Sequence, residues 1–173
     1  MTADGKGGPA FGSLFSGVGG IDLGLERAGF RAAWQVEIEP ARRAVLAARW
    51  PEAERHADVR TLAGRHLGPV ALVAGGFPCQ PVSAAGKRRG AADPRWLWPE
   101  FARILRVLRP RVALVENVPG LLARGRGMDD VVGELAACGY GAEWTSVPAA
   151  ALGAPHLRDR IWLVAYPDGE GRA

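Results

Sequence analysis

The sequence has little cysteine, little lysine and no long apolar run. Only Cys79 and Cys138 are cysteines among 173 residues, and without CxxC spacing they predict neither a disulfide framework nor a structural zinc site. No window approaches the roughly 18 apolar residues that a membrane span requires, and no secretory signal is visible. We therefore expect a soluble, cytoplasmic protein with no membrane partner and no metal.

An excess of one charge sign is also lacking. Lys+Arg number 22 against 18 for Asp+Glu, a net charge of +4, and Lys6 and Lys87 are the only lysines. This weakly basic balance fits an anionic partner such as nucleic acid, but it also fits an ordinary solvated surface. The 48% hydrophobic content excludes a disordered chain, and the length predicts one domain over 11–166, with a flexible lead-in at 1–10 and a tail at 167–173.

Short apolar runs alternate with helical periodicity along the whole chain. This pattern predicts an α/β fold with a mostly parallel sheet of about seven strands and helices on both faces. Strands are predicted at 12–15, 30–37, 56–59, 70–74, 112–116, 143–147 and 161–165. Helices are predicted to begin near residue 21, with Gly29 as a C-terminal cap, and to cover 40–49, 96–108 and 127–138.

A glycine-rich turn separates the first predicted strand from the first helix. Gly17, Gly19 and Gly20 permit a tight turn and a close ligand approach at the helix N-terminus. The spacing is not the full GxGxxG fingerprint, so a nucleoside without phosphates is favoured. Glu37 lies 20 residues after Gly17, where an acid typically reaches ribose, and Asp58 is placed to accept from an adenine amino group. A plain turn, a surface glutamate and a capping aspartate are the structural alternatives.

Cys79 follows the fourth predicted strand, between prolines and after two glycines. These neighbours argue against ordinary core packing and favour a stiff loop over the edge of the sheet where open α/β folds bind ligands. Cys138 lies on a predicted helix among apolar neighbours, so we expect it to be a buried core residue.

Four segments together resemble the DNA (cytosine-5) methyltransferase family. They are FSGVGG at 15–20, GFPCQ at 76–80, ENV at 116–118 and RDR at 158–160. They occur in the family order, each at a predicted strand end, and the resemblance covers about residues 11–166. It implies the Rossmann-like fold of methyltransferases that depend on S-adenosyl-L-methionine.

The resemblance also implies that S-adenosyl-L-methionine is the cofactor, which suits the incomplete glycine fingerprint because this molecule has no phosphate. In the family pattern, the phenylalanine and glycines of the turn line the methionyl part, while Glu37 binds ribose, Ile38 contacts the adenine face and Asp58 binds the adenine amino group. The implied cofactor residues are Phe15, Gly17, Gly19, Gly20, Glu37, Ile38, Asp58 and Pro78.

The implied reaction is methyl transfer to C5 of cytosine. Cys79 resembles the nucleophile that adds to C6 of the ring and makes C5 reactive. Glu116 resembles the residue that bonds cytosine N3, which requires a raised pKa. Arg158 and Arg160 resemble the pair that supports the base carbonyl and the catalytic loop, and the chemistry needs no metal.

The implied partner is double-stranded DNA with the target cytosine flipped out of the stack. A mobile loop is expected over 83–95, where a solvated charge run is the alternative for the basic triplet. The residues implied to contact nucleic acid are Gln80, Ser83, Lys87, Arg88, Arg89 and Asn117.

Two departures from the family pattern affect the functional prediction. His156 stands where the family usually has Gln, and family members normally continue into a target-recognition region and two final motifs that wall the cofactor pocket. We therefore expect a truncated enzyme, a split half completed by a second polypeptide, or a minimal protein without turnover, from a restriction-modification or phage system. Open alternatives are a non-catalytic subunit that binds the cofactor and nucleic acid, an RNA cytosine-5 methyltransferase and an NAD-dependent oxidoreductase.

Overall fold

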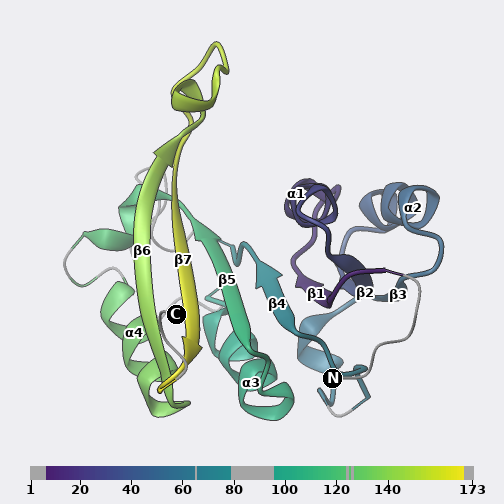
Figure 1. Cartoon of the computed structure of the whole chain (residues 1–173), viewed down its shortest axis with the longest axis horizontal. Coiled ribbons are helices and arrows are strands. Elements are labelled where there is room, and N and C mark those ends of the chain that lie inside the picture. The colour runs from purple at the N-terminus through teal and green to yellow at the C-terminus, as the bar shows by residue number, and fades with distance from the viewer. Residues whose placement is uncertain (1–6, 65, 79–95, 124, 126, 170–173) are drawn as a thin grey trace.

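Seven strands form one sheet with helices on both faces (Figure 1). The computed structural model describes residues 7–64, 66–78, 96–123, 125 and 127–169. Within them the strand order is β3-β2-β1-β4-β5-β7-β6. The predicted α/β fold with a mostly parallel sheet is confirmed.

The elements alternate along the chain as the hydrophobic pattern predicts. The strands are β1 (Ala10–Leu14), β2 (Arg31–Val36), β3 (Glu54–His56), β4 (Leu72–Gly75), β5 (Val112–Asn117), β6 (Tyr140–Pro148) and β7 (Asp159–Pro167). The α-helices are α1 (Gly20–Arg27), α2 (Pro40–Arg49), α3 (Trp98–Leu108) and α4 (Met128–Ala137). Short 3-10 turns are η1 (Val59–Thr61), η3 (Pro119–Leu122) and η4 (Ala149–Leu152).

The direction of the strands locates the ligand-binding edge of the sheet. The five strands β1 to β5 run parallel to their neighbours, and β7 runs antiparallel to both β5 and β6. The chain proceeds from β1 outward to β2 and β3, then returns to place β4 on the other side of β1. A crevice at the carboxyl ends of β1 and β4 is therefore expected, because ligands bind where the strand order reverses.

The sheet separates two hydrophobic cores. Beneath α3 and α4 lies the larger core, which contains Trp34, Phe101 and Leu135. Beneath α1 and α2 lies the smaller one, which contains Phe11 and Leu46. Both cores draw side chains from β1, β2 and β4, because successive residues of a strand point to opposite faces. The central strands are thereby fixed from both sides.

Three predicted strands differ clearly from the structure. Strand β3 lies earlier than the predicted 56–59, because Asp58 instead caps the 3-10 turn η1, where its Oδ1 accepts from the Arg60 N–H at 3.0 Å. Strands β6 and β7 each extend over nine residues, well beyond the predicted 143–147 and 161–165. Their pairing continues to Pro148 opposite Asp159, so the two strands project past the rest of the sheet as an arm (Figure 1).

Two remaining features follow the sequence pattern. The side chain of Cys138 is 4% exposed and belongs to the larger core, as expected for an apolar neighbourhood. Gly29 ends the first helix with φ of 90°, a conformation that glycine adopts at low cost. Among the helices of the described ranges, none is long and apolar enough to cross a bilayer.

Candidate cofactor and active site

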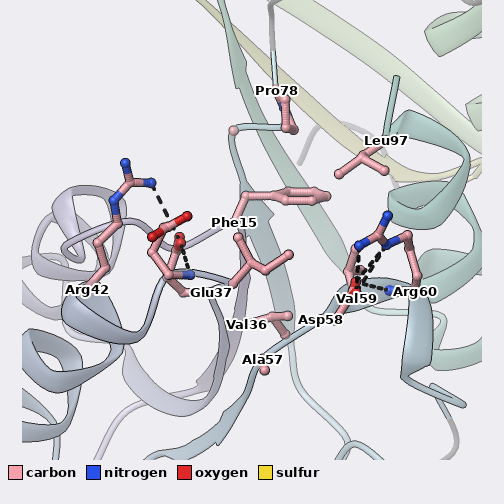
Figure 2. Close-up of a pocket in the computed structure, with 13 residues that line it drawn as sticks. Phe15, Val36, Glu37, Arg42, Ala57, Asp58, Val59, Arg60, Pro78 and Leu97 are labelled. Carbon is pink, nitrogen blue, oxygen red and sulfur yellow. Dashed lines mark hydrogen bonds and ion pairs between the residues drawn. The ribbon is translucent and has the colours of Figure 1, made fainter. Parts of the chain in front are cut away.

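A cavity of 610 Å³ lies at the predicted edge of the sheet. Its walls come from the ends of β1 and β2, the segment before η1 and the residues after β4 (Figure 2). The lining residues are Phe15, Val36, Glu37, Ile38, Glu39, Arg42, Ala57, Asp58, Val59, Arg60, Gly76, Pro78 and Leu97. The structure therefore brings together five of the residues predicted to contact a cofactor, which are Phe15, Glu37, Ile38, Asp58 and Pro78.

Glu37 forms one polar wall of this cavity. Its side chain is only 4% exposed, and its Oε2 accepts from the Gly17 N–H at 2.8 Å. Its Oε1 accepts from the Glu39 N–H at 2.9 Å and lies 3.6 Å from Nη1 of Arg42. A carboxylate has about four acceptor positions, so Glu37 retains capacity for ligand hydroxyls. The same side chain thus ties the glycine turn to β2 and faces the cavity.

The glycine turn needs its glycines for two different reasons. Gly17 has φ of 59°, and a Cβ built on it would have no atom within 4 Å, so the residue supplies conformation and open space. Gly19 has φ of 87°, and a Cβ there would lie 2.3 Å from the Trp50 ring. The turn can therefore pass closely over Trp50 while keeping its outer side free for a ligand.

Asp58 stands across the cavity from Glu37. The Arg60 guanidinium donates to it through Nε at 3.0 Å to Oδ1 and through Nη2 at 2.8 Å to Oδ2. These hydrogen bonds from Arg60 hold the pKa of Asp58 below its ordinary value. Apolar Phe15 and Val36 lie between the two acids (Figure 2). The cavity therefore offers two acceptor groups separated by an apolar surface.

Glu116 lies next to this cavity at the end of β5. Burial raises the pKa of Glu116, while the charges of Arg160 and Arg158 oppose that shift. Arg160 Nε lies 2.8 Å from Glu116 Oε1. A Cβ on Gly76 would lie 2.5 Å from Glu116 Oε2, and Gly76 also lines the cavity. Gly76 is therefore the point at which the cavity and the carboxyl of Glu116 meet.

Asn117 is buried beneath the chain segment that leaves β4. Its side chain is 2% exposed, and its Nδ2 donates to the Phe77 carbonyl oxygen at 3.2 Å. Its Oδ1 accepts from the Val118 N–H at 2.9 Å. The Phe77 ring packs edge-on against Trp96 with centroids 5.1 Å apart. These contacts fix the backbone immediately before Cys79.

Arg158 lies one residue before β7, at the outer end of the paired strands β6 and β7. Its side chain is exposed and its backbone has φ of 33°, a conformation that is uncommon outside glycine. The predicted residues Cys79, Gln80, Ser83, Lys87, Arg88 and Arg89 lie outside the described residues.

The family of this chain is shown by its sequence. The model of the C-5 cytosine-specific DNA methylase family matches residues 10–171. The chain belongs to this family.

Curated relatives of the chain include type II methyltransferases of three bacteria. The chain is 38% identical to M.NgoMIV of Neisseria gonorrhoeae over 155 residues, which are 88% of this chain and 50% of that protein. It is 40% identical to M.NaeI of Lentzea aerocolonigenes, covering 88% of this chain and 38% of that protein. It is 37% identical to M1.HphI of Haemophilus parahaemolyticus, covering 90% and 45%. The chain thus spans half or less of the length of these relatives.

Solved structures share the C-5 cytosine-specific DNA methylase fold. An E. coli prophage protein described as a DNA modification methyltransferase superposes with a TM-score of 0.77 at 28% identity, covering 92% of this chain and 47% of the other. A Spodoptera frugiperda DNMT2 variant superposes with a TM-score of 0.78 at 21% identity, covering 95% and 51%. The second likeness is one of fold alone.

The sequence motifs did not reveal the second set of side chains around the site. Arg60 binds Asp58, and Ser13, Asp22 and Gln35 form a buried polar cluster behind the glycine turn. The sequence signal that could have indicated the buried cluster is the polar character of residues 13 and 35 inside otherwise apolar strands. Their partner at position 22 belongs to a helix and shares no local motif with either.

Among the described residues, no group of three or more His, Cys, Asp or Glu side chains is arranged to hold a metal ion.

Proposed function

We propose that this chain is the catalytic part of a DNA (cytosine-5) methyltransferase that moves a methyl group from S-adenosyl-L-methionine to cytosine C5 in double-stranded DNA. The observation that carries the proposal is the position of Gly76, which lines the 610 Å³ cavity and also lies against Glu116. A cofactor pocket and a base pocket must adjoin for direct methyl transfer. The type II relatives favour a restriction-modification or phage system as the setting.

The cavity suits S-adenosyl-L-methionine by its chemistry. The molecule carries ribose hydroxyls and an adenine amino group, all of which are donors, and the cavity presents the carboxylates of Glu37 and Asp58. The glycine turn lacks the full GxGxxG fingerprint for a pyrophosphate, which argues against a dinucleotide. The apolar surface of Phe15 and Val36 between them suits the adenine and ribose faces. When bound, the cofactor supplies the methyl group.

The proposed contacts follow the positions of the lining residues. Glu37 would hold the ribose hydroxyls and Asp58 the adenine amino group, with exposed Ile38 against the adenine face. Phe15 and the glycine turn would receive the methionyl part. The residues assigned to the cofactor are Phe15, Gly17, Gly19, Gly20, Glu37, Ile38, Asp58 and Pro78.

Cys79 is assigned the role of nucleophile. Its thiolate adds to C6 of the flipped cytosine, forming a C6–S bond and moving ring electrons toward C5. After C5 has been methylated, loss of the C5 proton and departure of Cys79 restore the ring double bond. The described backbone reaches Pro78, directly before this cysteine, and Asn117 holds that backbone through the Phe77 carbonyl.

Glu116 is assigned the role of hydrogen-bond donor to cytosine N3. Its pKa is raised by burial, so the carboxyl holds a proton more readily than an ordinary glutamate and can donate to N3 as charge develops on the ring. Arg160 orients this carboxyl across 2.8 Å. Arg158 and Arg160 would also support the base carbonyl, because guanidinium groups remain charged and donate in a planar fork.

The nucleic-acid contacts are proposed from the loop after the nucleophile. Lys87, Arg88 and Arg89 would bind backbone phosphates of the duplex, and Gln80 and Ser83 would contact the DNA near the flipped base. Asn117 would act on the nucleic acid indirectly, through the backbone of Phe77 that it holds.

An additional polypeptide segment is proposed to complete the enzyme. The relatives are at least about twice as long as the matched region, and the face of β7 that carries Trp162 and Val164 belongs to neither described core. A target-recognition segment on the same polypeptide or on a second one would supply site specificity. We therefore expect residues 1–173 alone to bind the cofactor weakly and to lack site-specific methylation.

Cofactor titration tests the assignment of the cavity. We expect S-adenosyl-L-methionine to bind residues 1–173 measurably by calorimetry, and Glu37→Gln to weaken binding about tenfold through loss of a charged acceptor. NAD should show no binding. Binding of NAD without S-adenosyl-L-methionine would overturn the proposal in favour of an oxidoreductase.

Label transfer tests the chemistry. Mixed-sequence duplex DNA and transfer RNA are incubated with radiolabelled S-adenosyl-L-methionine and residues 1–173, alone and with a target-recognition segment taken from a relative. Label that appears in DNA and is abolished by Cys79→Ser supports the proposed reaction. Transfer to RNA alone would change the substrate class, and label that survives Cys79→Ser would contradict the nucleophile assignment.

A further inference from the structure

A buried polar cluster lies behind the glycine turn and outside the cavity. It joins Ser13 of β1, Asp22 of α1 and Gln35 of β2, whose side chains are 1%, 0% and 0% exposed. Gln35 Nε2 donates to Asp22 Oδ1 at 2.8 Å, and Ser13 Oγ donates to Asp22 Oδ2 at 3.0 Å. One carboxyl therefore connects the two strands that enter the site to the helix that leaves it.

Ser16 extends this cluster into the turn. Its Oγ lies 2.6 Å from Ser13 Oγ, and its backbone N–H donates to the Val36 carbonyl at 3.0 Å. Its own carbonyl accepts from the Gly19 N–H at 2.9 Å. The next residue is Gly17, whose N–H is bound by the Glu37 carboxylate. A continuous set of hydrogen bonds thus runs from Asp22 to the wall of the cavity.

The donors in the cluster can be counted. A serine hydroxyl has one proton, so when Ser13 donates to Asp22 its oxygen is left to accept from the Ser16 hydroxyl. Asp22 thereby sets the direction of the Ser13 hydroxyl, while the Ser16 hydroxyl also lies 3.2 Å from the Ser13 carbonyl oxygen and 3.3 Å from the Val36 carbonyl oxygen. Among the described residues Gln35 Oε1 has no partner, so the amide of Gln35 is oriented by Asp22. An apolar side chain at position 22 would leave the Ser13 and Gln35 donors without their acceptor.

The cluster is also costly to bury. Ser13 and Gln35 are uncharged, and desolvation raises the pKa of Asp22 despite their hydrogen bonds. Buried polar groups that only fill a core can be replaced by apolar ones with little loss. Here the cost falls at the junction of β1, β2 and α1, where the turn with positive φ at Phe15, Gly17 and Gly19 must be held.

We propose that Asp22 is a positioning residue for the cofactor turn, which holds Ser16 and Gly17 so that the Gly17 N–H meets Glu37. This inference rests on the proposed function, because the cofactor is what the turn would receive. Asp22 itself lies behind the turn and is fully buried, so it acts through Ser13 and Ser16 rather than on the ligand.

The test uses residues 1–173 with four substitutions. Asp22→Leu removes both acceptors at similar size, Ser13→Ala removes the hydroxyl that joins Asp22 to Ser16 but leaves the contact with Gln35, and Asp22→Asn keeps the shape and one acceptor. The matched control is Leu135→Ala, which removes a buried side chain of α4 on the other face of the sheet. Hydrogen exchange of the Gly17 and Gly19 amides is measured in the free chain, and the Kd for S-adenosyl-L-methionine is measured by calorimetry.

We expect Asp22→Leu and Ser13→Ala to speed exchange at Gly17 and Gly19 and to raise the Kd about tenfold, because each substitution breaks the buried hydrogen bond between Ser13 and Asp22. Asp22→Asn should restore both values to within about threefold of the unmodified chain. Leu135→Ala should lower the Tm while leaving the Kd unchanged. Should Asp22→Leu fail to fold, Ser13→Ala carries the same comparison.

Exchange at Gly17 that stays unchanged in both variants would overturn the positioning role, as would an equal acceleration in Leu135→Ala. Failure of the unmodified chain to bind S-adenosyl-L-methionine would count against the proposed function instead. In that case exchange in the free chain still decides whether Asp22 holds the turn.

Discussion

The half of the sheet built from β2, β1 and β4 contributes to both cores, whereas the half built from β5, β7 and β6 is buried mainly on one face. Val73 is 0% exposed in β4, and its neighbours Leu72 and Ala74 belong to the opposite core. In β7, Leu163 is 2% exposed and the adjacent Val164 is 38% exposed. We call these the closed half and the open half.

The difference separates two tasks of the chain. The closed half holds the cavity, where Glu37 must meet the glycine turn within a fraction of an ångström, and its strands are fixed by packing on both sides. The open half holds Glu116 and Arg160 at the base of an arm. If the proposed function holds, cofactor binding depends on the packing of this chain, whereas the proposed catalytic geometry also depends on what covers the open face.

The largest effect is expected from Leu46→Ala in the closed half. Leu46 is 0% exposed between α2 and the sheet, so its removal should lower the free energy of unfolding by about 2–5 kcal/mol. The size-matched control is Leu152→Ala, because Leu152 is 80% exposed in the η4 turn of the arm. This substitution should change the free energy of unfolding by less than about 0.5 kcal/mol. Urea denaturation measures both, and equal losses would abolish the distinction between the halves.

A matched pair of valines sharpens the comparison. Val73→Thr places a hydroxyl in the larger core and should cost about 1–3 kcal/mol of unfolding free energy. Val164→Thr makes the same change on the open face and should stay within about 0.5 kcal/mol. A cost for Val164→Thr as large as that for Val73→Thr would mean that the face is covered in solution, for example by self-association.

The smallest expected effect concerns pH. Burial raises the folded-state pKa of both Asp22 and Glu116, so the folded chain binds their protons more tightly than the unfolded chain does. Their stabilising contribution is complete below the ordinary carboxyl pKa and is lost as pH rises through the raised value. The loss of unfolding free energy with rising pH should be reduced more by Asp22→Asn than by Glu116→Gln, because the Arg160 guanidinium already compensates the charge of Glu116.

Unfolding free energies of the three proteins from pH 4 to pH 8 provide the measurement. We expect the unfolding free energy of Asp22→Asn to exceed that of the unmodified chain by an amount that grows with pH. An advantage that stays constant across the range would show that Asp22 does not titrate differently in the two states.

The predictable part of the fold was its hydrophobic alternation. The boundaries of α2 were predicted to the residue because Pro40 suits the first helical position. The ends of β6 and β7 were missed because they contain Gly141, Pro148 and the charged Asp159 and Arg160, while cross-strand hydrogen bonds need no apolar side chains. β3 was misplaced because a local cap at Asp58 competes with extended backbone.

The candidate site was predictable where residues share a sequence motif. Glu37 lies at a characteristic distance from Gly17, and the structure joins the two at 2.8 Å. The contact of Asp22 with Gln35 could not be predicted, since it depends on the packing angle of α1 against β2. The hydrogen bonds of Asn117 to backbone atoms likewise depend on how β4 and β5 pair.

Strand β6 has one further consequence for the behaviour of the chain in concentrated solution. It is the last strand of the sheet and runs for nine residues, so along its outer side the described residues offer no neighbouring strand. Such an edge strand is a template for aggregation, because the backbone of a second molecule can pair with it and extend the sheet. The exposed Trp144 side chain on the same strand adds apolar attraction to that pairing. We therefore expect the solubility of the purified protein to depend more on the edge strand β6 than on the modest net charge of +4.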